Sequence, residues 1–382
     1  MRLLLATSAL ASHHHAMVPF GWAALAAGHE VRLATSPELV AAAARSGLPV
    51  LPAGPALDFP ALHRELVADV SRTGRPYDPK VLYARVADLM ADALVALAVR
   101  WRPDAIVFDP ATLAAPVAAA ACGARAVRYL WGLDIMGRGA TLVERLPDSY
   151  AATWTRFGLA LPEDPDWWTF DPSPPSVWPV TTGYRRPVRY VPYSPQAELG
   201  RAAPPGGRAP SGPDDRPRVL LTFGAGIAAR EVVPLGGLAG SPVLQGILDL
   251  DVDVVLAVAP DDAAALGPLP ERVSVVSGSP LPALLAGTAA IVHHGGNGTL
   301  LTAALAGVPQ LVVSYLPETR FGARQFAPTG AVLHLPPEDA TRNEVGAAVG
   351  ECVDSGATRA AAATLRAEML AQPVPAELLA AF

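Results

Sequence analysis

A glycine-rich turn beside paired histidines is the part of this sequence with the clearest chemical potential. The apolar run Ala289 to His293 leads into His294-Gly295-Gly296-Asn297-Gly298-Thr299, and a helical pattern rich in Ala and Leu follows. A buried strand that ends in glycines and continues as a helix presents backbone N–H groups and the positive helix end to an anion. Glycine allows close approach of phosphates, His294 can donate to an oxygen and Thr299 can cap the helix. The turn predicts a diphosphate cradle, with a histidine buried beside a tight turn as the alternative.

A second glycine turn, Thr222-Phe223-Gly224-Ala225-Gly226, also follows an apolar run. It could pass close to a phosphate or to the ribose of a sugar nucleotide. A dinucleotide fingerprint requires a third glycine and an acidic residue about 20 positions later. Ala229 stands where that glycine is required, and the next apolar run begins only at Val252. These departures disfavour NAD, and a dinucleotide-dependent oxidoreductase is kept as an alternative function.

Three successive histidines, His13-His14-His15, follow the first apolar run, Arg2 to Ser8. At most one or two of them can act together, and a histidine is suited to general base catalysis because its pKa lies near neutrality. Asp109 follows the apolar run Ala105 to Phe108. If both runs are parallel strands, Asp109 lies on the same sheet edge and could fix the tautomer of the base. Solvated loop histidines and a metal site are the alternatives.

An acidic pattern resembles a metal motif but has the wrong position. Asp249-Leu250-Asp251-Val252-Asp253 contains the Asp-x-Asp pattern that can hold a divalent metal on diphosphate oxygens. It precedes the apolar run Val254 to Ala257, whereas ligands of parallel sheets bind at the carboxyl ends of strands. We therefore interpret it as the solvated start of a strand.

The elements that position these residues alternate between short apolar runs and helical patterns. Predicted strands of the first half are Arg2 to Ser8, Glu30 to Ala34, Pro49 to Leu51, Ala105 to Phe108 and Ala124 to Leu130. Helices are predicted from Met17 to Ala27, from Pro37, from Val81 to Trp101 and from Thr112. Predicted strands of the second half are Arg218 to Phe223, Val252 to Ala257, Val273 to Val276, Ala289 to His293, Gln310 to Val313 and Val332 to Leu335. Such alternation predicts α/β architecture with parallel sheets covered by helices.

A segment rich in Pro and Gly, 198–216, separates the two halves. It has little to bury and many residues that break regular structure, which is typical of a linker. We predict a first domain at 1–197 and a second at 217–382, whose C-terminal helix can pack back on the first domain. Two doubly wound, Rossmann-like domains facing a central cleft would bind ligands at the strand-to-helix turns.

Composition excludes several classes of protein. The chain has 382 residues, 51% of them hydrophobic and 17% charged, with a net charge of −6. These values argue against disorder and against binding of nucleic acid. No stretch reaches the ~18 uninterrupted apolar residues of a membrane span. Cys122 and Cys352 give neither metal spacing nor a disulfide framework, and Arg2 to Ser8 fits a core strand better than a signal peptide. A cytoplasmic location is expected.

Several separated segments resemble the GT-B glycosyltransferases, specifically the actinobacterial enzymes that attach deoxysugars to polyketides of the macrolide and anthracycline type. The segments in the first half are His13, Val18-Pro19, Trp22, 27–32, 130–134, 169–172 and 188–193. In the second half they are Pro280-Leu281, 293–299 and 307–310. The resemblance covers nearly the whole chain, and it implies a GT-B fold and an antibiotic-biosynthesis function.

The resemblance implies an inverting, metal-independent transfer from a nucleoside diphosphate sugar, expected to be a dTDP-deoxysugar, to a hydrophobic acceptor. By its distance from Pro19 and Trp22, His13 matches the base that deprotonates the acceptor, and Asp109 matches its carboxylate partner. Segment 294–299 matches the diphosphate cradle, to which Thr222 and Gly224 are added as donor-binding candidates. No cofactor or metal is expected, since the sugar nucleotide is a substrate.

Departures from the family pattern concern the donor. Gly278 replaces an aromatic residue that stacks on the nucleotide base, so base contacts are expected from the Ser279 backbone or from elsewhere in the chain. Glu318-Thr319 stands where an Asp-Gln pair binds sugar hydroxyls, which fits a sugar that lacks some hydroxyls or carries an amine.

Further expectations concern the acceptor and protein partners. Met17, Phe59, Trp131 and Trp154 are candidate residues of the acceptor pocket, with core packing as the alternative. A homodimer and a cytochrome-P450-like auxiliary activator are the protein partners considered. A non-catalytic, nucleotide-binding auxiliary homologue is a further alternative function.

Overall fold

The computed structural model describes residues 1–8, 10–73, 78–135, 146–162, 168–179, 184–195, 216–224, 235–259, 262–263 and 266–382. The chain divides into two compact units. The first comprises Met1–Pro172, Val180–Val188 and Pro373–Phe382, and the second comprises Ser173–Pro179 and Arg189–Gln372. The predicted linker, 198–216, lies outside the described residues except for Arg216, so the predicted domain boundaries stay predictions.

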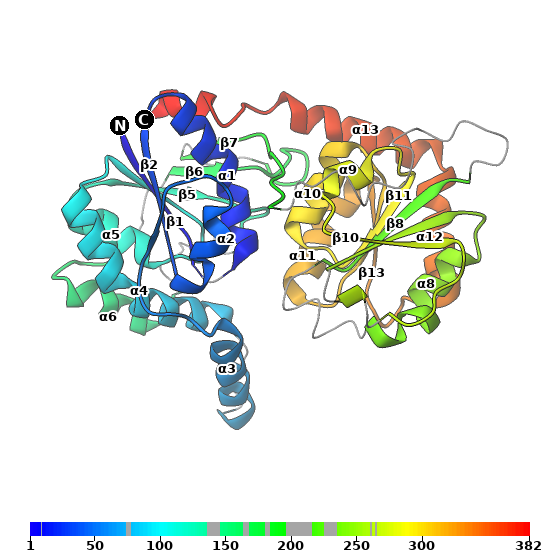
Figure 1. Cartoon of the computed structure of the whole chain (residues 1–382), viewed down its shortest axis with the longest axis horizontal. Helices are drawn as coiled ribbons and strands as arrows, with labels where there is room; N and C mark the ends of the chain where they lie inside the picture. Colours follow the sequence, from blue (N-terminus) through cyan, green and yellow to red (C-terminus); the bar gives the residue numbers. More distant parts are fainter. Residues whose placement is uncertain are drawn as a thin grey trace. The chain divides into compact units, whose positions relative to one another are not determined.

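Seven parallel strands form the sheet of the first unit, in the order β3-β2-β1-β4-β5-β6-β7 (Figure 1). They are β1 (Arg2–Ala6), β2 (Glu30–Thr35), β3 (Val50–Pro52), β4 (Ala105–Phe108), β5 (Arg125–Tyr129), β6 (Trp168–Asp171) and β7 (Arg185–Pro187). The central strands β1 and β4 are wholly apolar after Arg2, because helices cover a parallel sheet on both faces.

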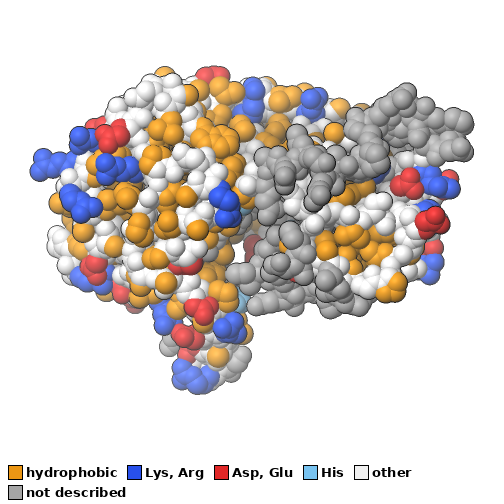
Figure 2. Space-filling view, in the orientation of Figure 1, with side chains coloured by type: hydrophobic (Ala, Val, Ile, Leu, Met, Phe, Trp, Pro, Cys, Tyr) orange, Lys and Arg blue, Asp and Glu red, His pale blue; other side chains and the backbone are white. Residues whose placement is uncertain are grey.

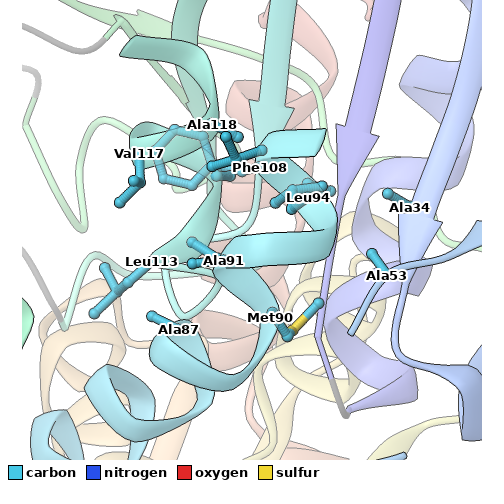
Figure 3. Close-up of a cluster of buried hydrophobic side chains, with 14 of the residues drawn as sticks. Ala34, Ala53, Ala87, Met90, Ala91, Leu94, Phe108, Leu113, Val117 and Ala118 are labelled. Atoms are coloured by element: carbon cyan, nitrogen blue, oxygen red, sulfur yellow. The ribbon is translucent and has the colours of Figure 1, made fainter. Parts of the chain in front are cut away.

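The helices of the first unit cover this sheet and bury its core. They are α1 (Ala11–Ala26), α2 (Val40–Ala44), α3 (Phe59–Thr73), α4 (Pro79–Trp101), α5 (Ala114–Cys122) and α6 (Asp148–Arg156). Helix α4 begins where the Asp78 side chain accepts a hydrogen bond from the Lys80 N–H group and Pro79 fills the first helical position. Figure 3 shows its residues Met90 and Leu94 in the same buried cluster as Phe108 of β4. Helix α3 projects from the rest of this unit (Figure 1).

Six parallel strands form the sheet of the second unit, in the order β10-β9-β8-β11-β12-β13. They are β8 (Arg218–Thr222), β9 (Asp253–Val258), β10 (Val273–Ser277), β11 (Ala290–His293), β12 (Gln310–Val313) and β13 (Val332–Leu335). The helices are α8 (Pro242–Leu248), α9 (Leu281–Leu285), α10 (Asn297–Ala306), α11 (Pro317–Phe326), α12 (Arg342–Asp354) and α13 (Gly356–Ala371).

Each sheet has one point where the direction of strand succession reverses. In the first sheet the chain moves outward from β1 to β3 on one side and from β4 to β7 on the other. In the second it moves from β8 to β10 and from β11 to β13. Ligands of doubly wound sheets bind at the carboxyl ends of the strands flanking such a point, here β1 with β4 and β8 with β11.

The structure differs from the sequence-based expectation in several elements. Helix α1 begins at Ala11 and not at Met17, so the three histidines lie within its first two turns and not in a loop. Pro19 favours a helix start, yet it lies inside α1, where its ring nitrogen cannot donate a backbone hydrogen bond. Helices α3 and α6 and strands β6 and β7 were not predicted. β6 and β7 are short and rich in polar residues or arginine, which hides the strand pattern.

Charged and apolar side chains are mixed on the drawn surface of the molecule. On the face drawn in Figure 2, acidic and basic side chains are interspersed among apolar ones, and no extended basic field appears. Within the described ranges, no helix combines the length and apolar character needed to cross a membrane.

Candidate active site

The residues predicted to form a base and its partner meet at the switch point of the first sheet. His13 lies in the first turn of α1, which follows β1, and Asp109 directly follows β4. Because β1 and β4 are paired in register up to Ala6 and Phe108, the residues after them emerge at one edge. The His13 Nδ1 atom lies 3.1 Å from Asp109 Oδ1, and both side chains are buried.

The Asp109 carboxylate accepts hydrogen bonds from three described residues. It accepts from the imidazole Nδ1–H of His13, from the Ala111 N–H group at 2.9 Å and from the Thr112 hydroxyl at 2.5 Å. Three donors stabilise a buried anion and compensate for its desolvation. With Nδ1 engaged, Nε2 is the imidazole atom left to exchange a proton, since it has no hydrogen-bond partner among the described residues.

The candidate acceptor residues have different positions. The Trp131 ring lies parallel to the His13 imidazole, with centroids 3.7 Å apart and 8° between the planes. Met17 is fully buried and Trp154 is 3% exposed, so both belong to the core. Phe59 opens α3 and packs near Tyr83 of α4, 6.3 Å between ring centroids. Of these four, Trp131 stacks on the His13 imidazole, and Met17 lies one helical turn after His13 within the core.

His14 and His15 have environments unlike that of a proton-exchanging base. Burial, assisted by the neighbouring His15, lowers the pKa of His14 to about 4. Burial and the positive charge of Arg45 lower the pKa of His15 to about 4 as well. Both imidazoles are therefore neutral and weakly basic at neutral pH.

The second candidate site lies at the switch point of the second sheet, where β11 ends and α10 begins. Gly296 is the N-cap of α10, and no side chain caps this helix end. The prediction that Thr299 caps the helix is therefore wrong, because Thr299 lies inside the first turn. The N–H groups of Asn297, Gly298 and Thr299 point out of that turn without an intrahelical acceptor. An uncapped helix N-terminus of this kind can bind an anion.

The glycines of both turns make room for His294. A Cβ atom on Gly224 would lie 2.8 Å from His294 Cε1, and one on Gly296 would lie 2.6 Å from His294 Nε2. Gly224 has a φ of +76°, and Gly295 has a φ of +90° with no room for a Cβ beside Val312. The packing of the protein itself therefore requires these glycines. Their predicted role was to let phosphates come close to the backbone.

His294 is neutral and incompletely satisfied. Burial lowers the pKa of His294 to about 4. Its Nδ1 atom is buried and has no hydrogen-bond partner among the described residues. A buried ring nitrogen without a partner is costly unless a ligand or water completes it, which fits a site for an oxygen-rich ligand.

His293 has a structural role that was not predicted from the sequence. Its Nδ1 accepts from the Gly295 N–H group at 3.1 Å, and its Nε2–H donates to Gln310 Oε1 at 2.9 Å. The Gln310 amide donates in turn to the Leu300 carbonyl of α10 at 3.2 Å. Burial, with a smaller effect of His294, lowers the pKa of His293 to about 3, so the ring stays neutral. A glutamine opening an otherwise apolar strand is the sequence signal that could have revealed this connection.

The remaining donor candidates differ in what their polar groups contact. The Thr222 hydroxyl donates to the Ala257 carbonyl at 2.9 Å and accepts from the Gly224 N–H group, so it shapes the turn. The Ser279 hydroxyl is buried and has no partner among the described residues. Thr319 uses its hydroxyl within the start of α11, where it donates to the Leu316 carbonyl, while Glu318 is exposed.

Tyr190 was not singled out as a site residue, and nothing in its local sequence signals the contact it makes. Its hydroxyl donates to the Gly298 carbonyl in the first turn of α10, at 3.3 Å. Residues 189–195 belong to the second unit, so this contact lies within one unit.

The Asp-x-Asp pattern lies where it was predicted. β9 begins at Asp253, which places the pattern at the amino end of the strand. Asp249 pairs with Arg342, and Asp251 pairs with Arg216 at 2.5 Å. Within the part of the chain that the structure describes, no group of three or more His, Cys, Asp or Glu side chains could hold a metal.

The sequence matches the models of one protein family in both halves. Residues 22–224 match the N-terminal domain described as erythromycin biosynthesis protein CIII-like, and residues 241–382 match the C-terminal domain of that description.

Individual proteins are similar over nearly their full length. The chain is 33% identical to tylactone mycaminosyltransferase of Streptomyces fradiae, covering 99% of this chain and 91% of that protein. It is 35% identical to TDP-daunosamine transferase DnrS of Streptomyces peucetius, covering 98% and 94%. Glycosyltransferase VinC in complex with dTDP is similar in structure, with a TM-score of 0.80 and 32% identity over 100% of this chain and 98% of that one. These likenesses confirm the predicted GT-B fold and favour a transferase over the oxidoreductase alternative.

Proposed function

The chain belongs to the erythromycin biosynthesis protein CIII-like family of glycosyltransferases, and from that premise we propose its reaction. The chain transfers the sugar of a dTDP-deoxysugar to an apolar polyketide acceptor, with inversion at the anomeric carbon and without a metal. The observation that carries this proposal is the buried His13–Asp109 pair, 3.1 Å apart at the switch point of the first sheet. A weakly acidic alcohol needs a base to become a nucleophile, and this pair supplies one.

In the proposed reaction, His13 Nε2 takes the proton of the acceptor hydroxyl. The acceptor oxygen forms a bond to the anomeric carbon while the bond from that carbon to the diphosphate oxygen breaks. The electron pair of the broken bond leaves with dTDP, and attack opposite the leaving group inverts the configuration. Asp109 stabilises the imidazolium that forms and holds Nδ1 protonated throughout.

We assign the leaving diphosphate to the turn between β11 and α10. The free N–H groups of Asn297, Gly298 and Thr299 and the imidazole of His294 supply donors to its oxygens. The buried Ser279 hydroxyl supports a further donor contact near Gly278, which has no side chain to stack on a base. Asp249 and Asp251 of the Asp-x-Asp pattern are paired with arginines at the opposite end of the strands, which supports transfer without a metal.

The names of the relatives supply the substrates to be tried. One relative is named for mycaminosyl transfer to tylactone, another for TDP-daunosamine. We propose an amino-deoxysugar of this kind as donor and a macrolactone or anthracyclinone as acceptor. A homodimer and a cytochrome-P450-like activator remain proposals for the assembly.

The test is turnover of tylactone with TDP-activated mycaminose or daunosamine, measured as TDP release and as glycoside mass. His13→Ala should lower turnover by about a hundredfold or more while the affinity for dTDP is unchanged, because the base lies outside the cradle. Turnover within a few-fold of wild type would show that His13 is not the base. Thermal stabilisation by NAD or NADP but not by dTDP would favour the oxidoreductase, and dTDP binding with no TDP release from either donor would favour the auxiliary homologue.

A further inference from the structure

Trp131 takes no part in the proposed chemistry, yet its ring stacks on the proposed base. Its indole covers one face of the His13 imidazole, at 3.7 Å between centroids and 8° between planes. Asp109 contacts the same imidazole at its edge, through Nδ1. The edge contact allows the ring to rock about the hydrogen bond, whereas a parallel surface restricts the ring plane. Together the two contacts determine the direction of Nε2.

The geometry of the stack suits a charged imidazole better than a neutral one. Neutral aromatic pairs prefer offset or edge-to-face arrangements, with centroids about 4.5–7 Å apart. A cation lying over an indole face, within about 6 Å of its centroid, is attracted by the ring quadrupole. In the proposed transfer, His13 becomes such a cation when it takes the acceptor proton. The close parallel stack therefore stabilises the state that the transfer creates.

The loop that carries Trp131 is fixed by a buried ion network. Asp134 is 4% exposed at its side chain and bridges two arginines, Arg128 of β5 at 2.6 Å and Arg185 of β7 at 2.9 Å. The Leu130 N–H group donates to the Phe170 carbonyl of β6 at 2.9 Å. The loop is thus held on three strands of the first sheet, on both sides of Trp131. Buried charges are costly unless paired, so this loop has one strongly preferred position.

We propose that Trp131 is a positioning residue for the base: its indole, fixed by the Asp134 network, orients His13 and stabilises the imidazolium formed during transfer. This rests on the proposed function of His13. The proposal also gives Trp131 a role different from the predicted one, which was to line the acceptor pocket. A pocket wall would act on acceptor binding, whereas a positioning residue acts on the rate of the bound complex.

The kinetic test uses the tylactone assay with four single variants, among them His13→Ala, and one double variant. Trp131→Leu should lower kcat by about tenfold, within the range of a desolvated cation–π contact, with KM for both substrates within about twofold. Trp131→Phe keeps an aromatic face and should recover most of the loss. Trp22→Leu is the matched control, because Trp22 lies on the same helix as His13 but is 44% exposed. In a His13→Ala background, Trp131→Leu should cause no further loss, since its effect passes through His13.

A spectroscopic readout tests the stack without turnover. The His13 Cε1–H proton resonance, assigned by its loss in His13→Ala, should lie upfield in the wild-type protein because of the indole ring current. It should move downfield in Trp131→Leu and stay upfield in Trp22→Leu. A His13 resonance at its ordinary position in the wild-type protein overturns the proposal, even if a Trp131 variant fails to fold.

The outcomes separate this proposal from the proposed function. Turnover that survives in His13→Ala contradicts the base itself. An inactive His13→Ala together with an unchanged kcat in Trp131→Leu contradicts only the positioning role. A raised acceptor KM at constant kcat, or an equal loss in the His13→Ala background, returns Trp131 to the acceptor pocket.

Discussion

At the scale of single residues, the two candidate sites treat their histidines in opposite ways. His13 has a charged partner at one edge and an aromatic face above it, so a positive charge on the ring is accommodated. His294 is enclosed between Gly224 and Gly296, and burial lowers its pKa to about 4. A base must gain a proton, whereas a donor to a diphosphate must only keep its N–H group. The surroundings of each ring fit the part proposed for it.

Asp109→Asn tests the pairing of the base. The amide would place an NH2 group among the three donors that now converge on the carboxylate, and it would favour the wrong tautomer of His13. We expect kcat to fall by about a hundredfold or more with unchanged dTDP affinity, which steady-state kinetics and calorimetry would measure. A loss of dTDP affinity of the same size would contradict an effect confined to the base.

Gly224→Ala tests why the turn after β8 is glycine. The new Cβ would lie 2.8 Å from His294 Cε1, so the imidazole must move. We expect dTDP affinity to fall by about tenfold or more, as one charge-assisted hydrogen bond is lost. Gly267→Ala is the matched control, because Gly267 has a similar φ of +67° but open space around it. Equal losses in both variants would show that backbone strain, and not displacement of His294, is the cause.

At the scale of elements, α10 is the helix on which the proposed donor site depends. Its first turn is left open for a ligand, so other contacts must hold the helix in position. Gln310 of β12 connects the Leu300 carbonyl with His293, and Tyr190 donates to the Gly298 carbonyl. The anchors of α10 therefore come from a neighbouring strand and from a segment distant in sequence.

Gln310→Met tests this anchoring. The substitution keeps the shape, but it leaves the buried His293 Nε2–H group without its acceptor and removes the side-chain bond from Gln310 to the Leu300 carbonyl of α10. We expect the free energy of unfolding to fall by about 1–3 kcal/mol, the cost of one unsatisfied buried donor, together with weaker dTDP binding. Urea denaturation of Gln245→Met gives the comparison, because Gln245 makes one hydrogen bond, to the Ala239 carbonyl. Similar unfolding midpoints for the two variants would contradict the anchoring.

At the scale of the whole molecule, both units contain buried histidines that must stay neutral. The pKa values of His14, His15 and His294 are lowered to about 4, and that of His293 to about 3, with burial as the main cause. Their ordinary value, 6.5, applies in the unfolded chain. The unfolded state therefore binds more protons than the folded state between about pH 4 and pH 6.5.

This difference predicts loss of stability in mild acid. The free energy of unfolding should fall as the pH drops below 6.5, by up to about 1.4 kcal/mol per pH unit for each of these histidines. The contribution is absent above pH 6.5, where all are neutral in both states. Melting temperature between pH 7.5 and 5 measures the effect, with dTDP omitted. A melting temperature that is constant or rises toward pH 5 would contradict neutral burial of these rings.

The sequence by itself determined the alternation of strands and helices, the strand-to-helix turns and the residue types at their ends. These are local properties, because period, chain breakers and glycine act over a few residues. Only the tertiary structure decided that β1 adjoins β4, and thus that His13 meets Asp109, that Trp131 covers the base and that Gly224 makes room for His294. Such contacts depend on strand order and on how distant side chains pack, which no local pattern encodes. For the same reason Met17, a candidate for the acceptor pocket, lies in the core, while the polar Gln310 anchors α10.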